Sequence, residues 1–238
     1  MPKLGINIDH IATIRQARRE LDPDPVAGAK VCEKAGAHSI VCHLREDRRH
    51  INDRDVIRLK KSLRTKLTLE MSINERIVAF ALKVRPSKAM IVPEKRKEVT
   101  TEGGLDVIKS AHQLKRIIPR LAKRNIEVCL FVDPDKKQID CARKLGVDSI
   151  ELHTGCYANA KTKSQQAKEL QKLRKMSFYA HQLGLIVNAG HGLKYHNVKL
   201  IAKIEYIHEL NIGHSIISKA VFVGLEKAVK EMFKQMKG

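Results

Sequence analysis

The chain has 238 residues and carries 46 Lys and Arg against 26 Asp and Glu, a formal net charge of +20 at pH 7. No apolar run approaches the ~20 residues that a membrane-spanning helix needs. Basic residues occur in almost every segment with helical spacing, whereas only 4% of the residues are aromatic and none is Trp. This composition disfavours both a membrane protein and a single-strand nucleic-acid binder.

Chain length and cysteine content indicate the number of domains and the kind of compartment. There is no Pro-, Gly- or Ser-rich linker, so we expect one domain over residues 1–238. The five cysteines form no CxxC pair and are odd in number; they are Cys32, Cys42, Cys129, Cys141 and Cys156. The chain enters an apolar run almost at once, so we expect no signal peptide. Together these features predict a cytoplasmic protein without a disulfide framework.

Eight short apolar runs recur along the chain, and nearly all end in a polar residue. Each is rich in Ile, Val and Leu and too short for a core helix, which is typical of a strand buried on both faces. The runs are LGINID (4–9), HSIVCHL (38–44), KLTLEMS (66–72), AMIVPE (89–94), EVCLFVD (127–133), SIELHT (149–154), LIVNAG (185–190) and HELNIG (208–213). Helical spacing fills the stretches between them. The alternation predicts a TIM (β/α)8 barrel, whose active site lies at the carboxyl ends of the strands.

Alternate residues within these runs differ in polarity. In the first run Ile6 and Ile8 share one face, and Asn7 and Asp9 share the other. In four later runs the corresponding second face carries Val41 and His43, Thr68 and Glu70, Glu151 and His153, and Glu209 and Asn211. One buried polar residue is usually a satisfied core group. Several near the same strand ends predict a polar pocket inside the barrel.

Three segments suit phosphorylated substrates. HLREDRRHIND (43–53) is either a solvated charged loop or an anion site in which Arg45 binds phosphate beside a basic His43 or His50. NAGHGLKYHN (188–197) and NIGHSIISKAV (211–221) follow the seventh and eighth runs and contain Gly192 and Gly213. The loops after strands seven and eight are the usual phosphate site of such barrels.

The segment PEKRKEVTTEGGLDV (93–107) follows the fourth run. It is long, charged and contains Gly103 and Gly104, so it is either an ordinary surface loop or a lid hinged at the glycines. We place such a lid over residues 93–104.

A metal site is disfavoured, although the interior would hold several ligand types. The candidates are Asp9, His10, His43, Glu70, His153 and His191. No strand carries a close pair of histidines, and no HExxH pattern occurs. We therefore expect no metal.

Seven segments carry a resemblance to a known family: NIDHIATIRQAR (7–18), HLREDRRHI (43–51), LEM (69–71), VPEKRKEVTTEGGLDV (92–107), ELHTGCYA (151–158), VNAGHGLKYHNV (187–198) and ELNIGHSII (209–217). The resemblance is to the pyridoxine 5′-phosphate synthase family of vitamin B6 biosynthesis, and it runs from residue 4 to about residue 233. It implies a TIM barrel with a few extra helices. It also implies that 3-amino-2-oxopropyl phosphate condenses with 1-deoxy-D-xylulose 5-phosphate, giving pyridoxine 5′-phosphate, phosphate and water without cofactor or metal.

The resemblance also implies roles for individual residues. His43 and Glu70 match the family's general bases, His191 its general acid, and Glu151 the carboxylate that supports the transition state. The residues matching the site for the aminooxopropyl phosphate are Asn7, Arg18, Gly192, Gly213 and His214. Those matching the site for the deoxyxylulose phosphate are Asp9, His10, Arg45, His50 and Thr100. Ser215 replaces a common Ala, and Arg19 a common small residue. Family members form octamers built from dimers, so we expect a homo-oligomer.

Two other classes stay open at this point. A barrel aldolase or isomerase acting on one sugar phosphate would share the fold, but the runs carry almost no lysine for a Schiff base. A nucleic-acid-binding protein would use the +20 charge and would bind in a salt-dependent manner.

Overall fold

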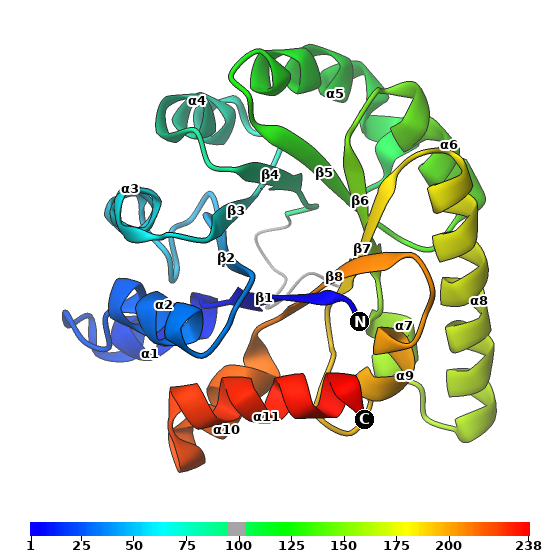
Figure 1. Ribbon diagram of the computed structural model, residues 1–238. Coiled ribbons are helices and arrows are strands. Elements are labelled where there is room, and N and C mark those ends of the chain that lie inside the picture. Colours follow the sequence, from blue (N-terminus) through cyan, green and yellow to red (C-terminus); the bar gives the residue numbers. More distant parts are fainter. Residues whose placement is uncertain (95–102) are drawn as a thin grey trace.

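All eight predicted strands form, and they close into one barrel. The computed structural model describes residues 1–94 and 103–238. The strands are β1 (Lys3–Asn7), β2 (Ser39–His43), β3 (Lys66–Met71), β4 (Lys88–Ile91), β5 (Glu127–Val132), β6 (Ser149–His153), β7 (Ile186–Gly190) and β8 (Ile207–Ile212). Each pairs in parallel with its neighbours in chain order, and β8 returns to β1 (Figure 1). The TIM-barrel prediction is confirmed.

Helices surround this ring of strands (Figure 1). They are α1 (Asp9–Arg18), α2 (Pro25–Lys34), α3 (Asp53–Ser62), α4 (Glu75–Val84), α5 (Val107–Ala122), α6 (Lys136–Lys144), α7 (Gly155–Ala158), α8 (Lys163–Gln182), α9 (Val198–Ala202), α10 (His214–Val223) and α11 (Leu225–Lys237). Pairs of helices follow β1, β6 and β8, which are the extra helices that the family resemblance implies. None of the helices in the described ranges is long and apolar enough to cross a membrane.

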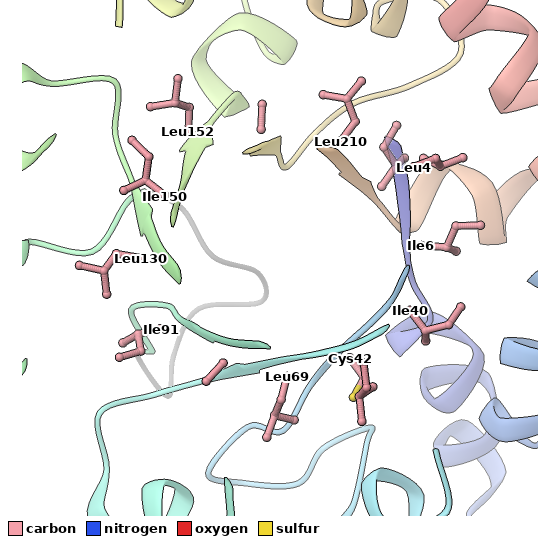
Figure 2. Close-up of a cluster of buried hydrophobic side chains, with 14 of the residues drawn as sticks. Leu4, Ile6, Ile40, Cys42, Leu69, Ile91, Leu130, Ile150, Leu152 and Leu210 are labelled. Carbon is pink, nitrogen blue, oxygen red and sulfur yellow. The ribbon is translucent and has the colours of Figure 1, made fainter. Parts of the chain in front are cut away.

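The two faces of the strands divide as the alternation predicts. Figure 2 shows apolar side chains radiating away from the ring toward the helices, among them Ile6, Ile40 and Leu152, all fully buried. The inward face holds a separate small apolar cluster of Met90, Val92, Cys129 and Phe131. The remaining inward positions are largely polar, so the barrel interior is divided between this cluster and the groups of the site.

The register of the parallel strands sets which inward groups become neighbours. His43 on β2 lies beside Glu70 on β3, and Glu151 on β6 beside Asn188 on β7. Towards the amino ends of the strands, buried Lys88 pairs with Glu127 at 3.0 Å. Charged groups at that end therefore neutralise one another, whereas those at the carboxyl end face a cavity.

A buried ion pair fixes the loop that follows β2. Arg15 on α1 donates two hydrogen bonds of 2.8 Å to the carboxylate of Asp55 and a third, of 2.9 Å, to the carbonyl of His50. Asp55 also completes a capping box with Asn52, which begins α3. The loop from His43 to His50 is thus tied at its far end to two helices.

Candidate active site

A cavity of about 700 Å³ opens at the carboxyl ends of the strands. It brings together most of the residues that the sequence singled out, although they are scattered over more than 200 positions. The predicted residues that line it are Asn7, Asp9, His10, His43, Arg45, His50, Glu70, Glu151, His191, Gly192, Gly213 and His214. The proposed acid–base groups therefore share one open cavity with the proposed phosphate loops.

Two predicted site residues are not among this set. Arg18 lies at the end of α1 with a side chain that is 81% exposed and 3.6 Å from Glu20, away from the cavity lining of this chain. Its role in phosphate binding stays a prediction. Thr100 lies outside the described residues, as do positions 95–102 of the predicted lid. Arg19, the departure noted beside Arg18, is exposed and ends α1 in a left-handed conformation.

His43 occupies the centre of one half of the cavity. Its main-chain N–H donates to Asp9 Oδ1 at 2.8 Å. Its ring lies between two carboxylates, with Nδ1 3.7 Å from Glu70 Oε2 and Nε2 3.6 Å from Glu94 Oε2. Both ring distances exceed a hydrogen bond but are within ion-pair range. The ring is therefore placed to take a proton and to pass it to either side.

Glu94 is a functional candidate that the sequence reasoning missed. Its side chain is only 2% exposed, its Oε1 accepts the N–H of Glu46 at 2.9 Å, and Arg45 lies 3.8 Å away. Burial alone would raise the pKa of Glu94, but the contacts with His43, Glu46 and Arg45 lower it. A signal was present, because the fourth run ends in Glu94, three residues beyond the end of β4 at Ile91, where the polar ends of the other runs also lie.

Burial shifts the pKa values of two further inward carboxyl groups, Glu70 and Glu151, in the opposite direction. Burial, helped by the charges of Asp9 and Glu151, raises the pKa of Glu70 well above its ordinary value. Burial likewise raises the pKa of Glu151 to about 7, although Asn211 Nδ2 donates to its Oε2 at 2.5 Å. A carboxylate with a raised pKa is a stronger proton acceptor, and one near 7 exchanges protons readily at neutral pH.

Within the described ranges, Asp9, His43 and Glu70 offer ligand atoms that all lie within 4.8 Å of one another. These are the residues that could hold a divalent cation. Asp9 is already engaged, because its two oxygens accept hydrogen bonds from the His43 main chain and from Asn7 Nδ2. The expectation of a metal-free enzyme stays a prediction, which activity in the presence of a chelator tests.

His191 occupies the other half of the cavity, directly after β7. Its ring centroid lies 5.1 Å from that of His153, edge to face, and 6.3 Å from that of Phe131. Burial, followed by the charge of His153, lowers the pKa of His191 to about 4. With only protein groups around it, the ring is neutral at pH 7. A role as general acid therefore requires a negative charge that arrives with the substrate.

Two adjacent loops form the proposed phosphate site. Gly213 directly precedes α10, whose first N–H groups have no partner within the helix and can bind an anion. A Cβ on Gly213 would lie 2.8 Å from that of Asn7, so only glycine fits. Ser215 Oγ donates to Leu193 O at 2.8 Å and joins this loop to the one after β7. Ser215, which stands where Ala is common in the family, thus adds a hydrogen bond between the two loops.

Three further histidines line the cavity near these loops. The rings of His10 and His214 meet edge to face at 5.0 Å. The N–H of Ile51 donates to His50 Nδ1 at 2.8 Å, so the neutral ring of His50 carries its proton on Nε2. Burial is the main cause that lowers the pKa of both His10 and His50. Neutral rings at these positions can donate hydrogen bonds to a phosphate without adding charge.

The lining includes Asn211, which the alternation placed in the polar pocket, and further residues that the sequence reasoning had not assigned to the site: Thr13, Arg49, Val92, Phe131, Asn159, Leu193, Lys194 and Ile212. Lys194 bears on the aldolase alternative. The described strand lysines Lys3, Lys66 and Lys88 begin their strands and do not line the cavity, whereas Lys194 does but is exposed on a loop. A Schiff-base lysine is normally activated by burial, so this arrangement does not favour one.

Comparison with known proteins decides the family. The family model described as pyridoxal phosphate biosynthesis protein PdxJ matches residues 4–238. The chain belongs to this family. PdxJ relatives from two strains of Coxiella burnetii, Dugway 5J108-111 and RSA 493, are named pyridoxine 5′-phosphate synthase. Each is 55% identical over 232 residues, which cover 98% of this chain and 97% of the relative.

Solved structures similar to this member of the PdxJ family support the fold. KGPDC from Streptococcus mutans matches with a TM-score of 0.68 at 12% identity, covering 100% of this chain and 98% of that one. Phosphoribosylanthranilate isomerase from Thermotoga maritima matches with a TM-score of 0.62 at 14% identity over the whole of both chains. At such identities the likeness concerns the barrel alone.

Proposed function

We propose that this protein is a pyridoxine 5′-phosphate synthase that condenses 3-amino-2-oxopropyl phosphate with 1-deoxy-D-xylulose 5-phosphate. The products are pyridoxine 5′-phosphate, inorganic phosphate and water. One observation carries the proposal: in a chain of the PdxJ family, the four residues that match the family's acid–base groups, His43, Glu70, Glu151 and His191, all line one cavity.

The chemistry fits these four groups. An amine adds to a ketone, water and phosphate leave, and a carbon–carbon bond closes the ring, so each step moves a proton or releases a poor leaving group. His43 and Glu70 serve as bases, and the 3.7 Å between His43 Nδ1 and Glu70 Oε2 keeps the two groups within ion-pair range. Glu151 supports the charge that develops, and His191 protonates a leaving oxygen. Such groups each contribute roughly 10²–10⁴-fold to a rate.

The substrates carry one phosphate each, and the site offers two regions for them. We assign the aminooxopropyl phosphate to Asn7, Gly192, Gly213 and His214, with Arg18 as a further contact. We assign the deoxyxylulose phosphate to Asp9, His10, Arg45 and His50, with Thr100 as a further contact. Support comes from the cavity, which is lined by all of these residues except Arg18 and Thr100.

The test is direct. Purified protein receives both substrates together with a chelator, and pyridoxine 5′-phosphate is measured by chromatography. We expect product from the wild type and a loss of at least roughly 10²-fold in His43→Asn and Glu70→Gln, while the circular dichroism spectra of both variants stay like that of the wild type. His112→Asn, the same change on exposed α5, is the control and should keep full activity. No product from the wild type contradicts the proposal, and consumption of a single substrate favours the aldolase or isomerase reading.

We further propose that residues 1–238 fold as one domain and that the protein works as a homo-oligomer, an octamer built from dimers. Exposed apolar side chains support an interface, notably Phe222 at 88% and Val221 at 69% exposure. The five cysteines are all free, in keeping with a cytoplasmic location. Light scattering gives the assembly, and a mobility-shift assay at physiological salt tests the nucleic-acid alternative.

A further inference from the structure

The carboxyl end of β6 packs against His191 from outside the cavity. This segment consists of His153, the last residue of β6, followed by Thr154 and Gly155, and it is held by Asp133 after β5. Neither His153, Thr154 nor Asp133 lines the cavity. These side chains are nevertheless buried or anchored, and their contacts converge on the proposed general acid. They therefore act through His191 and not on the substrate.

Thr154 holds the main chain at His191. The side chain is fully buried, and its Oγ1 lies 2.7 Å from the carbonyl oxygen of Gly190 and 2.6 Å from that of His191. The hydroxyl proton is shared between these two acceptors. The main-chain N–H of Thr154 donates to Gly190 O as well, at 2.8 Å. One buried threonine thus binds both carbonyls of the peptide segment that presents the acid.

This segment needs such support because its conformation is unfavourable. His191 has φ of +79° and is followed by Gly192 with φ of +77°. A left-handed conformation costs a residue other than glycine about 1 kcal/mol or more, and it persists only where neighbouring groups hold it. The hydrogen bond to His191 O supplies a restraint at the position where the strain occurs.

His153 holds the ring. Its imidazole meets that of His191 edge to face, with centroids 5.1 Å apart. Its Nδ1 lies 2.9 Å from Asp133 Oδ1, and Phe131 covers it at 5.2 Å. At the other end, a Cβ on Gly155 would lie only 2.3 Å from His153 Nε2, so the ring abuts the main chain there. The His153 ring is held by Asp133, Phe131 and the main chain at Gly155, so it can restrict the movement of the His191 ring.

Asp133 holds the His153 ring in place. Its Oδ1 also accepts the main-chain N–H of Gly104 at 3.1 Å, and the hydrogen bond with His153 is the main cause that lowers the pKa of Asp133. The carboxylate is therefore charged at neutral pH and maintains its bond to His153 Nδ1. Because the side chain is 49% exposed, it can be substituted without opening the core.

We propose that Thr154, His153 and Asp133 are positioning residues for His191: Thr154 fixes its main chain, and His153, held by Asp133, fixes its ring. The inference rests on the proposed function, in which His191 donates a proton. A general acid must lie within hydrogen-bond reach of its target, and a displacement of about 1 Å can cost roughly 10²-fold in rate. A side chain on a strained loop meets this requirement only with rigid neighbours.

The test compares hydroxyl removal with hydroxyl retention. Thr154→Val keeps the shape and loses the hydroxyl, whereas Thr154→Ser keeps the hydroxyl. We expect Thr154→Val to lower kcat by roughly 10- to 100-fold with KM within about 3-fold, and Thr154→Ser to retain kcat within about 3-fold. Ser177→Ala is the matched control, because Ser177 is fully buried on α8 and donates to Glu205 O at 2.9 Å, far from the site. It should leave kcat unchanged.

A double-substitution series separates positioning from general stability. In a His191→Asn background, Thr154→Val and Asp133→Asn should cause no further loss of kcat beyond about 2-fold, because the group through which they act is gone. In the wild-type background we expect Asp133→Asn to lower kcat about 3- to 10-fold. Equal losses in both backgrounds would overturn the inference. If Thr154→Val does not fold, Asp133→Asn carries the same comparison.

Crystal structures of the variants give a readout that needs no turnover. We expect the His191 ring to move or to show more than one position in Thr154→Val and in Asp133→Asn, and to stay in place in Ser177→Ala. An unmoved ring in both site variants would refute the positioning role. If the wild type makes no product, the proposed function is wrong. The position of the His191 ring in the variant structures then tests the positioning role by itself.

Discussion

The two imidazoles assigned to proton transfer lie in opposite surroundings. His43, in the half of the cavity built from β1 to β4, lies between the carboxyl groups of Glu70 and Glu94. His191, in the half built from β5 to β8, lies against the rings of His153 and Phe131. We refer to these as the acidic half and the aromatic half. His43 thus has carboxyl groups beside both ring nitrogens, whereas the rings that contact His191 belong to a histidine and a phenylalanine.

The surroundings of His43 and His191 distinguish the proposed base from the proposed acid, although both are histidines. A base must pass its proton on, and His43 has an acceptor on each side. His191 is neutral at pH 7 in its own surroundings, because burial lowers its pKa to about 4. It gains a proton only when a negative charge comes close, and both proposed substrates carry phosphate. The aromatic half thus gains charge from its ligand, whereas the acidic half already contains Glu94, whose pKa is lowered by its contacts with His43, Glu46 and Arg45.

Glu151 on β6 belongs to the aromatic half, and its buried carboxyl group gives a large effect on stability that depends on pH. Burial raises its pKa from 4.5 to about 7, so the folded state binds this proton more tightly than the unfolded state. Wild-type stability should therefore fall as the pH rises from 4.5 to 7. Glu151→Gln removes the ionisation, so at pH 8 the variant should be more stable than the wild type by about 1–3 kcal/mol.

Urea unfolding at several pH values measures this difference. It should shrink as the pH falls through 7 and vanish near 4.5, where the wild-type carboxyl group is protonated in the folded state and half-protonated in the unfolded state. A gap that stays constant with pH would show that Glu151 is not the group with the raised pKa. Product formation by Glu151→Gln should nevertheless be low, because the charge that supports the transition state is gone.

Glu94→Gln tests whether the second carboxylate of the acidic half takes part. The variant keeps an oxygen for the N–H of Glu46 but loses the charge that faces His43 and Arg45. We expect kcat to fall about 10-fold, less than in Glu70→Gln. The double variant His43→Asn/Glu94→Gln should be no slower than His43→Asn alone. Losses that multiply would mean that Glu94 acts independently of His43.

The aromatic half can be tested by titrating His191 directly. Histidine ring NMR signals, assigned with His191→Asn, should give a pKa of about 4 for the protein alone. Saturating inorganic phosphate or pyridoxine 5′-phosphate should raise this value by about one unit or more, since an anion favours the imidazolium. A pKa that does not respond to either ligand would remove the distinction between the two halves.

Much of the fold and of the site follows from the sequence for a simple reason. Strand residues alternate with a period of two, so the pattern that buries Ile6 and Ile40 against the helices also turns Asn7 and His43 inward. Parallel strands then bring their carboxyl ends to one edge. The sequence also indicated the loops after β7 and β8, because glycines mark close approaches of the main chain.

The remaining features depend on contacts between distant segments. Parity gives the face of a residue but not its neighbours, so neither the rings around His191 nor its low pKa could be predicted. The same holds for the bond from Thr154 to His191 O, which joins residues 37 positions apart. Arg18 matched the family motif, yet its exposure reflects the direction in which α1 ends, and no pattern within α1 encodes that direction.

The smallest expected effect on activity concerns the hydrogen bond that joins the loop after β7 to the loop after β8. We call this contact between Ser215 and Leu193 the seam. Ser215 Oγ donates to Leu193 O, so Ser215→Ala removes one hydrogen bond and no charge. A neutral hydrogen bond contributes about 1 kcal/mol, so the loops should stay folded but be held less firmly. We expect KM for one phosphorylated substrate to rise about 2- to 5-fold with kcat unchanged, measured with the other substrate saturating. If kcat fell instead, the seam would be holding the nearby proton donor His191 and not the phosphate, and the aromatic half would extend as far as α10.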